Sequence, residues 1–221
     1  MLRQDYILRM IQQLAQAVAR LTAKARTEEP AAVHAELHDA LKDLTGLDFD
    51  VLDSLPLAAV LQVLEADNDP NPARILAIAE CSFIRARLAD AADQVDIALR
   101  ARVMALTLYL ETFTLFRHEA LAEAEKRAED LLADLGAIDL PRDTILRLFR
   151  YRSATGRFAD AENSLFDLVD RGLANSAVIG EGQKFYRRLL DLEDAQLAAG
   201  ELPRDEVIEG QAELEVASVG S

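Results

Sequence analysis

The strongest constraint on the fold lies between Thr144 and Arg171, where apolar residues recur at helical spacing on both sides of one glycine. Intervals of three and four residues place apolar side chains on a single face of a helix. Gly156 interrupts this pattern, and glycine readily takes the left-handed backbone conformation that ends many helices. The stretch therefore predicts two amphipathic helices joined by a tight turn.

The composition extends this prediction to the whole chain. Only six prolines and nine glycines occur in 221 residues, which leaves few turn residues for a fold rich in strands. A hydrophobic fraction of 51% excludes a wholly disordered chain, and the length suffices for one domain or two small ones. We expect an all-α fold, an irregular stack of antiparallel helical hairpins with about nine to eleven helices.

The pattern divides the chain into an amphipathic helix in residues 1–26, a small helical layer over 27–70, a hairpin domain over 71–216 and a frayed tail at 217–221. Asn71 and Pro72 form a helix-start signal, because asparagine caps helices and proline suits the first helical position. Residues 95–116 are apolar on nearly every face, which predicts the hydrophobic centre. The predicted helices span about 4–24, 31–44, 57–65, 72–88, 90–116, 118–135, 141–154, 158–171, 176–199 and 203–216, with a short helical turn at 47–52.

The helix predicted at residues 4–24 has a seam of apolar residues at alternating intervals of four and three, namely Ile7, Ile11, Leu14, Val18 and Leu21. Residues 1–26 carry a net charge of +4, whereas the chain as a whole carries −15. Three interpretations are open: the seam packs on the acidic body, it mediates self-association or partner docking, or it lies on a membrane surface. The last has basic residues in its favour, but the helix lacks Trp and Phe.

Net charge and cysteine content restrict the class of protein. A charge of −15 repels phosphate backbones, so we expect no nucleic-acid binding. Cys81 is the single cysteine, which excludes an intramolecular disulfide and favours a reducing compartment. Arg9 and three nearby glutamines interrupt any signal-peptide core, and no apolar stretch is long enough to span a bilayer. We therefore expect a cytoplasmic protein.

The hairpin predicted between Thr144 and Arg171 resembles a tetratricopeptide repeat in its turn and second helix. The residues that carry this resemblance are Gly156, Phe158, Ala161, Leu165 and Leu168. The same face occurs 37 residues earlier, at Leu121, Ala124, Ala128 and Leu131. The usual aromatic residue early in the first helix is missing, so the resemblance covers one hairpin well and one poorly. It implies a tetratricopeptide-like α-solenoid, in which first helices line a groove for a protein or peptide partner.

The whole chain also resembles a family of uncharacterised bacterial proteins, a domain-of-unknown-function family. The resemblance rests on the motif at Asp5–Ile11, on Gly46–Asp48 and on Leu140–Leu168. It implies a bacterial, cytoplasmic, all-helical protein and carries no activity or functional residue.

Candidate metal sites are weak. His34 and His38 lie four residues apart on one helix face, but no third ligand accompanies them. Asp67, Asp69 and Asn71 imitate the start of a calcium loop, but Pro72 stands where that loop needs glycine. We expect no metal and no cofactor.

Catalytic motifs are also missing from the sequence. Gly180 and Gly182 lack the third glycine of a dinucleotide-binding turn, and no serine lies in a nucleophile elbow. Cys81 is surrounded by apolar residues and is expected to be a buried small hydrophobe. We therefore expect a protein that is not an enzyme.

A basic cluster is the candidate partner-binding surface, formed by Arg147, Arg150, Tyr151, Lys184 and Arg187. Basic side chains in a groove can clamp a partner's carboxylate. The alternative is that the arginines of this region pair within the chain, with Asp143, Asp160, Glu162 and Asp191. The sequence thus favours a helical scaffold or adaptor that binds a protein or peptide. The alternatives are an assembly or membrane-peripheral protein acting through residues 4–24, and a ligand-binding protein or enzyme with an unrecognised site.

Overall fold

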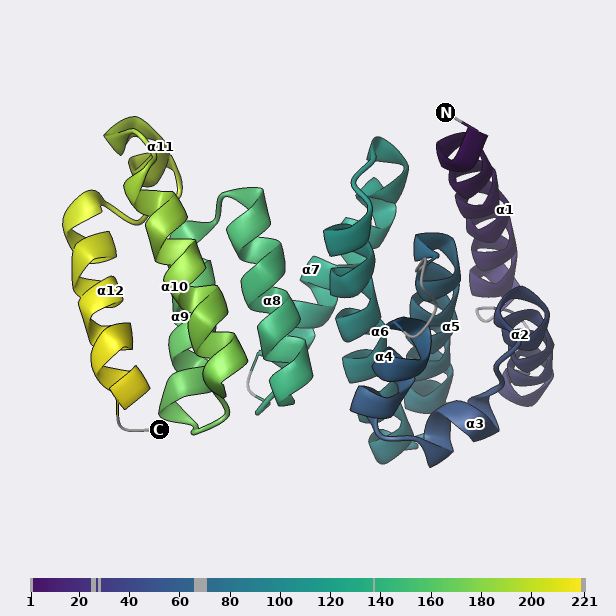
Figure 1. The fold of residues 1–221 in the computed structure, drawn as a ribbon. Helices are drawn as coiled ribbons and strands as arrows, with labels where there is room; N and C mark the ends of the chain where they lie inside the picture. Colours follow the sequence, from purple (N-terminus) through teal and green to yellow (C-terminus); the bar gives the residue numbers. More distant parts are fainter. Residues whose placement is uncertain (1, 25–26, 28, 66–70, 137, 220–221) are drawn as a thin grey trace. The chain divides into compact units, whose positions relative to one another are not determined.

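A computed structural model of the chain describes residues 2–24, 27, 29–65, 71–136 and 138–219. These residues form twelve α-helices and one short 3₁₀ helix, with no strand among them, so the predicted all-α stack is confirmed (Figure 1). The chain forms two compact units, Met1–Asp139 and Leu140–Ser221, and each is described by itself. The division lies inside the segment 71–216 that the sequence pattern treats as one domain.

Unit 1 contains seven α-helices and the 3₁₀ helix. They are α1 (Leu2–Lys24), α2 (Pro30–Thr45), α3 (Phe49–Ser54), α4 (Leu57–Glu65), α5 (Pro72–Ala91), α6 (Val95–Leu115), η1 (Glu119–Leu121) and α7 (Ala122–Leu135).

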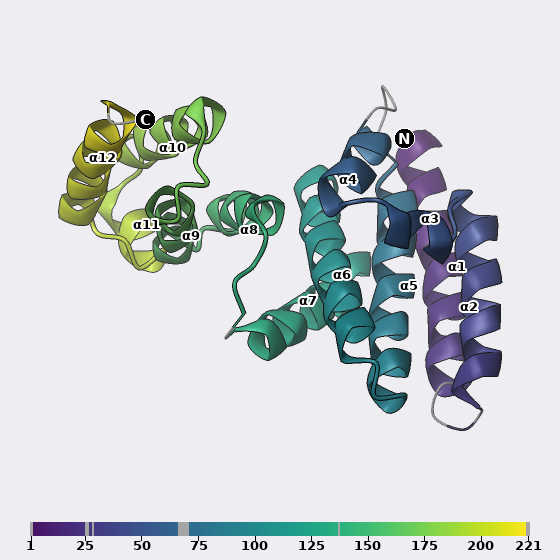
Figure 2. The same ribbon diagram turned by 90° about the horizontal axis from the view of Figure 1, so that it is seen from below.

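Helix α5 is the centre of unit 1. The Asn71 side chain accepts a hydrogen bond from the Ala73 amide at 3.1 Å, and Pro72 follows as the first helical residue, as the start signal predicts. Fourteen of the twenty residues of α5 are buried, so no side of the helix is left for solvent along most of its length. Helices α1 and α2 cover one side and α6 the other (Figure 2).

The predicted hydrophobic centre at residues 95–116 corresponds to α6, which shares this role with α5. Helix α6 is buried chiefly from Ala98 to Phe113. Its first turn is open, because Val95 is 73% exposed and Ile97 is 37% exposed. The apolar stripe therefore continues beyond the part of the helix that the fold covers.

The seam of α1 is buried within the chain. Its five residues are 2–7% exposed, and α1 packs against α5, α2 and η1. The interpretation that the seam packs on the body is thus confirmed. Each fully buried leucine or isoleucine stabilises such packing by about 1.5–3 kcal/mol.

A charged pair lies in the interior of unit 1. The Arg127 guanidinium on α7 donates a hydrogen bond to the Glu80 carboxylate on α5, which is 5% exposed. Burial raises the pKa of Glu80 although Arg127 opposes the shift. Burial and then the charge of Glu80 raise the pKa of the Tyr109 hydroxyl well above its ordinary value.

Unit 2 contains α8 (Arg142–Thr155), α9 (Phe158–Asp170), α10 (Ser176–Leu190), α11 (Asp194–Ala199) and α12 (Arg204–Val219). Gly156 ends α8 in the left-handed conformation with φ of 81°, and its amide donates to the Arg152 carbonyl, so the predicted α8–α9 hairpin is confirmed. Helix α10 lies beside α8, where the rings of Phe149 and Phe185 meet with centroids 5.4 Å apart. Phe158, Leu165 and Leu168 are buried in the core of this unit.

The prediction of one helix over 176–199 is wrong. The chain leaves the helix after Leu190, and α11 begins after Glu193, whose side chain accepts from the Gln196 amide while the Gln196 side chain accepts from the Glu193 amide. This reciprocal capping satisfies amides at the start of a new helix and competes with continuation of α10. Helix α12 also extends to Val219, past its predicted end near Val216.

Asp67 and Asp69 of the calcium-loop imitation lie outside the described residues. Among the helices that the structure describes, none combines the length and apolar character needed to cross a membrane.

Two glycines of α10 predict opposite effects of the same substitution. A Cβ atom on Gly182 would lie 2.7 Å from Leu214 and 2.8 Å from Leu165, whereas a Cβ atom on Gly180 would meet nothing within 4 Å. Gly182→Ala should lower the free energy of unfolding by about 1–3 kcal/mol through overpacking. Gly180→Ala should raise it by about 0.5–1 kcal/mol, because alanine is the better helix former. Urea unfolding followed by circular dichroism checks both signs, and equal effects of the two variants would contradict the packing of α10.

The buried Glu80–Arg127 pair predicts that replacing Arg127 lowers the free energy of unfolding by an amount that depends on pH. Arg127→Met leaves the Glu80 charge buried without its partner and should destabilise the protein by about 3 kcal/mol at neutral pH. A buried carboxyl with a raised pKa binds its proton more readily in the folded state, so the loss should shrink as the pH falls toward the ordinary glutamate value. Urea unfolding at about pH 8 and about pH 5 measures this. The double variant Glu80→Gln/Arg127→Met is the control and should lack this pH dependence.

Candidate binding cleft

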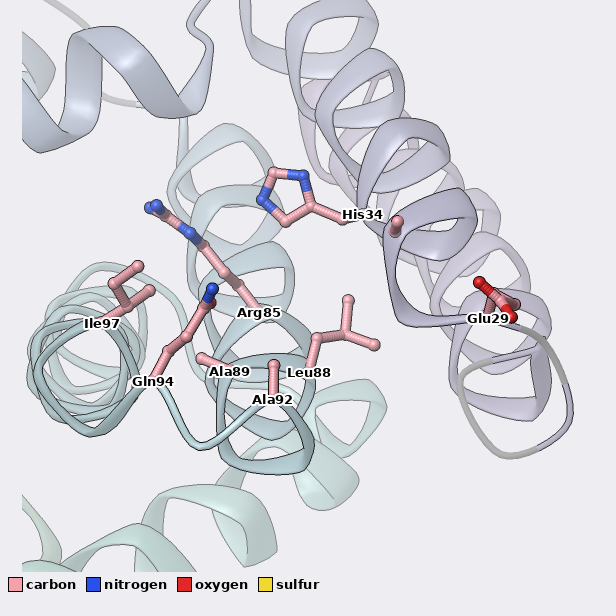
Figure 3. A pocket seen from close by; sticks show the side chains of 9 residues that line it. Glu29, His34, Arg85, Leu88, Ala89, Ala92, Gln94 and Ile97 are labelled. Atoms are coloured by element: carbon pink, nitrogen blue, oxygen red, sulfur yellow. The ribbon is translucent and has the colours of Figure 1, made fainter.

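An open cleft of about 640 Å³ lies over the C-terminal half of α5 in unit 1 (Figure 3). Helix α5 forms its floor, and residues at the starts of α2 and α6 form its walls. Most of its lining is apolar, with a few polar groups. The lining residues are Glu29, Ala31, His34, Arg85, Leu88, Ala89, Ala92, Gln94 and Ile97.

The tight turn between α5 and α6 sets one wall of the cleft. Asp93 takes a left-handed conformation with φ of 54°, which aspartate tolerates better than most residues. The Gln94 amide then donates to the Ala89 carbonyl at 2.8 Å and turns the chain back into α6. This geometry places Gln94 and Ile97 beside the floor residues Ala89 and Ala92 (Figure 3).

Arg85 connects the cleft to the short helix α3. Its guanidinium donates two hydrogen bonds to the Asp53 carboxylate, at 2.8 and 2.6 Å, and lies 4.5 Å from the centroid of the Phe49 ring. Arg100 of α6 donates to the Asp53 carbonyl at 3.3 Å. A bidentate arginine–carboxylate pair fixes orientation as well as distance, so α3 is held against both α5 and α6.

The Arg85–Asp53 pair adds no net charge to the cleft, whereas Glu29 adds a carboxylate to its lining. Burial, followed by the charge of Arg85 and the neighbouring His38, lowers the pKa of His34. The hydrogen bond from Arg85 lowers the pKa of Asp53, which therefore stays ionised and balances the arginine. A neutral imidazole offers one donor and one acceptor to a bound group.

The lining residues carry three side chains that can be charged, Glu29, His34 and Arg85. They include no hydroxyl or thiol group, and His34 is their single imidazole. Cys81 is buried, and burial raises the pKa of its thiol to about 12, which keeps it protonated. The rings of His34 and His38 both lie against Phe49, with centroids 5.6 and 6.1 Å from it. Within the described ranges, no group of three metal-binding side chains is arranged to hold an ion.

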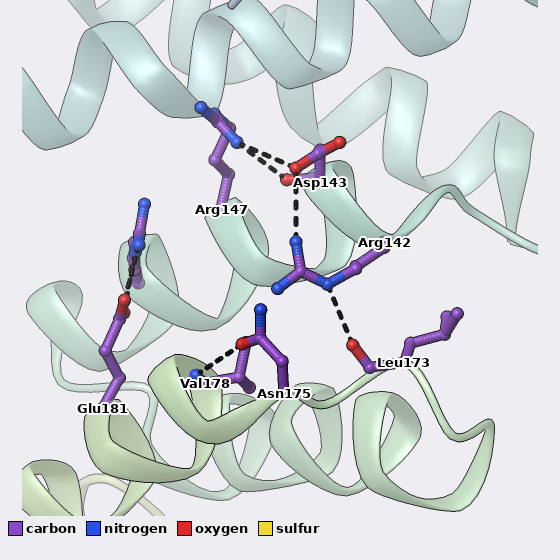
Figure 4. A network of polar contacts seen from close by, with 8 residues as sticks. Arg142, Asp143, Arg147, Leu173, Asn175, Val178 and Glu181 are labelled. Carbon is purple, nitrogen blue, oxygen red and sulfur yellow. Dashed lines mark hydrogen bonds and ion pairs between the residues drawn. The ribbon is translucent and has the colours of Figure 1, made fainter. Parts of the chain in front are cut away.

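The predicted basic surface lies on α8 and α10 of unit 2, and Figure 4 shows one of its residues, Arg147, beside Asp143. Arg150 is 35% exposed and donates two hydrogen bonds to the Glu181 carboxylate, at 2.8 and 2.6 Å. Lys184 and Arg187 are exposed, and Arg187 donates to the Gln183 carbonyl of its own helix at 3.3 Å. Arg147 and Tyr151 are buried, and Arg147 lies 3.9 Å from the Asp143 carboxylate.

Pairing within the chain accounts for several arginines of this region. Asp143 is also 3.7 Å from Arg142, and Asp160 pairs with Arg157 at 2.8 Å, as the pairing alternative predicts. The partner of Arg150 is Glu181, which the sequence pattern did not identify. Glu162 instead accepts a hydrogen bond from the Tyr186 hydroxyl at 2.6 Å.

Sequence reasoning missed most of the cleft. It considered His34 as a metal ligand and did not single out Arg85, Asp53 or Phe49. Arg85 and Asp53 are 32 residues apart and belong to no local motif, so only the packing of α3 on α5 reveals their pairing.

Comparison with known proteins gives one match. A family model described as a family of unknown function (DUF6483) matches residues 1–217. The resemblance to a domain-of-unknown-function family, noted from the sequence, is thus confirmed. No curated protein and no solved structure matches the chain.

The lowered pKa of His34 predicts a pH effect on stability. Below about pH 6.5 the unfolded chain takes up a proton at this position before the folded chain does, so His34 lowers stability as the pH falls from that value through its folded pKa. His34→Gln removes this contribution and should give a shallower loss of stability on acidification. Urea midpoints measured from about pH 7.5 to about pH 5 check the slope, and parallel curves for the two proteins would refute the assignment.

Proposed function

We propose that this chain, which belongs to the DUF6483 family, is a non-enzymatic helical scaffold that binds a partner protein through a peptide segment. The observation that carries the proposal is the open apolar cleft over α5. Its volume of about 640 Å³ lies in the usual range of binding sites. A segment seated there would place apolar side chains on Leu88, Ala89 and Ile97.

The short helix α3 supports this interpretation from within the chain. Its Phe49 ring lies against His34 and Arg85, two residues that also line the cleft. The surface beside the cleft therefore already accepts an aromatic side chain from a helical segment. A partner would add a second apolar group next to the Phe49 ring. His34 and the side-chain amide of Gln94 would offer hydrogen bonds to the partner's backbone.

The hairpins of unit 2 fit the same role. Helices α8 and α9 pair as a hairpin, and α10 packs on α12 and lies beside α8. We describe this arrangement as tetratricopeptide-like. Lys184 and Arg187 are exposed cations on α10, which would be the first helix of the second hairpin. The single cysteine, Cys81, which is buried and free, favours a reducing, cytoplasmic compartment, and the bacterial assignment rests on the family resemblance.

Assembly or membrane attachment through residues 4–24 has less support. The apolar seam of α1 is buried against α5, α2 and η1, so using it for a partner would require α1 to leave unit 1. That step would expose five apolar side chains.

A blocking variant tests the cleft. Ala92→Trp places an indole in the cleft from an exposed position, whereas Ala91→Trp adds the same side chain one residue earlier, outside the lining. A photo-crosslinker at Ile97 should capture a polypeptide partner in cells of the native host, and Ala92→Trp should reduce capture at least about tenfold. Ala91→Trp should capture like the parent protein. Equal capture by both tryptophan variants, or capture unchanged when the crosslinker is moved to exposed Val63, would overturn the proposal.

A further inference from the structure

The last helix of unit 2 has one buried face and one open apolar face. Val207, Gly210 and Leu214 of α12 are buried, on the side that packs on α10. On the opposite side, Ile208, Ala212 and Val216 follow one another at intervals of four residues and form a row along the helix. Ile208 is 55% exposed and Val216 is 75% exposed.

Carboxylates border this row. Asp205, Glu206, Glu209, Glu213 and Glu215 are all exposed on α12. The single cation of the helix, Arg204, is engaged, because it pairs with Asp194 at 2.6 Å and donates to the Leu190 and Leu192 carbonyls. The described part of α12 therefore presents an apolar row with acidic edges.

The carboxylates of α12 also act on a neighbouring group. Burial raises the pKa of Glu162 on α9, the hydrogen bond from the Tyr186 hydroxyl opposes this shift, and the charges of Glu206, Glu213 and Glu209 raise the pKa further.

Ile208, Ala212 and Val216 are all exposed and lie on one face of α12. Single exposed apolar residues need no explanation, but three in register on one face match the anchor spacing of a helix-in-groove or helix-on-helix interface.

We propose that the outer face of α12 docks a basic amphipathic helix of a partner protein. The partner's apolar row packs on Ile208, Ala212 and Val216, and its lysines or arginines pair with the bordering carboxylates. A second copy of α12 is disfavoured by like charge, and an anionic membrane surface is disfavoured for the same reason. This surface is separate from the cleft over α5, so its test stands independently of the proposed function.

The test uses a designed amphipathic peptide of about 18 residues, with leucines on one face and lysines on the other, titrated with the full chain. Fluorescence anisotropy should give a dissociation constant in the micromolar range, and the counterpart with glutamates should not bind. Ile208→Ser/Val216→Ser should weaken binding at least about tenfold. The matched variant Val51→Ser/Val63→Ser, which removes two exposed apolar side chains from α3 and α4, should bind like the parent protein. Circular dichroism verifies that both variants keep their helices.

Two charge-reversal variants distinguish docking on α12 from general attraction of the peptide to an acidic protein. Glu209→Lys/Glu213→Lys and Asp39→Lys/Asp43→Lys change the net charge equally, at exposed positions of α12 and α2. Only the α12 variant should lose the peptide. Equal losses from the two charge variants, or parent-like binding by Ile208→Ser/Val216→Ser, would overturn the proposal. Loss of the peptide through Val51→Ser/Val63→Ser would show attraction to any exposed apolar residue and would also overturn it.

Discussion

The burial of α5 is the constraint on which the architecture of unit 1 depends. A helix with fourteen buried residues out of twenty has no polar face to turn to water, so other helices must cover it on several sides. Helices α1, α2 and α6 supply that cover, and the apolar seam of α1 is used for it. The amphipathic first helix is therefore a structural part of the unit, and its basic residues Arg9 and Arg20 are exposed.

The same constraint explains both polar features of unit 1. Glu80 lies on α5, so covering the helix removes its carboxylate from water and makes the Arg127 guanidinium its necessary partner. Towards its C-terminus, α5 is covered less completely, because α6 begins with an exposed turn and α3 reaches only as far as Phe49 and Asp53. The cleft is the place where the cover stops, so its floor exposes Leu88 and Ala89 of α5 together with Arg85, and the neighbouring helices add further polar groups.

Unit 2 follows a different principle. Its helices pair as successive hairpins, and close contacts at small residues set their approach, as at Gly182 between Leu165 and Leu214. A stack of this kind ends in a helix with one face unused, and on α12 that face carries an apolar row between carboxylates. The chain thus has a candidate binding surface in each unit, of different chemistry, which is the property expected of an adaptor.

The sequence by itself determined the features that arise from neighbouring residues. Helical periodicity, the Asn71–Pro72 start, the left-handed Gly156 and the seam of α1 were predictable because each depends on contacts within a few residues or on one repeated face. The break after Leu190 was missed. The capping by Glu193 and Gln196 that begins α11 depends on side-chain hydrogen bonds, which the spacing of apolar residues does not reveal. Tertiary structure alone decided the pairs Arg85–Asp53, Glu80–Arg127 and Arg150–Glu181, which are 32, 47 and 31 residues apart. Such pairs depend on which helices become neighbours, and that choice is made by burial of whole faces, so no local pattern in the chain records it.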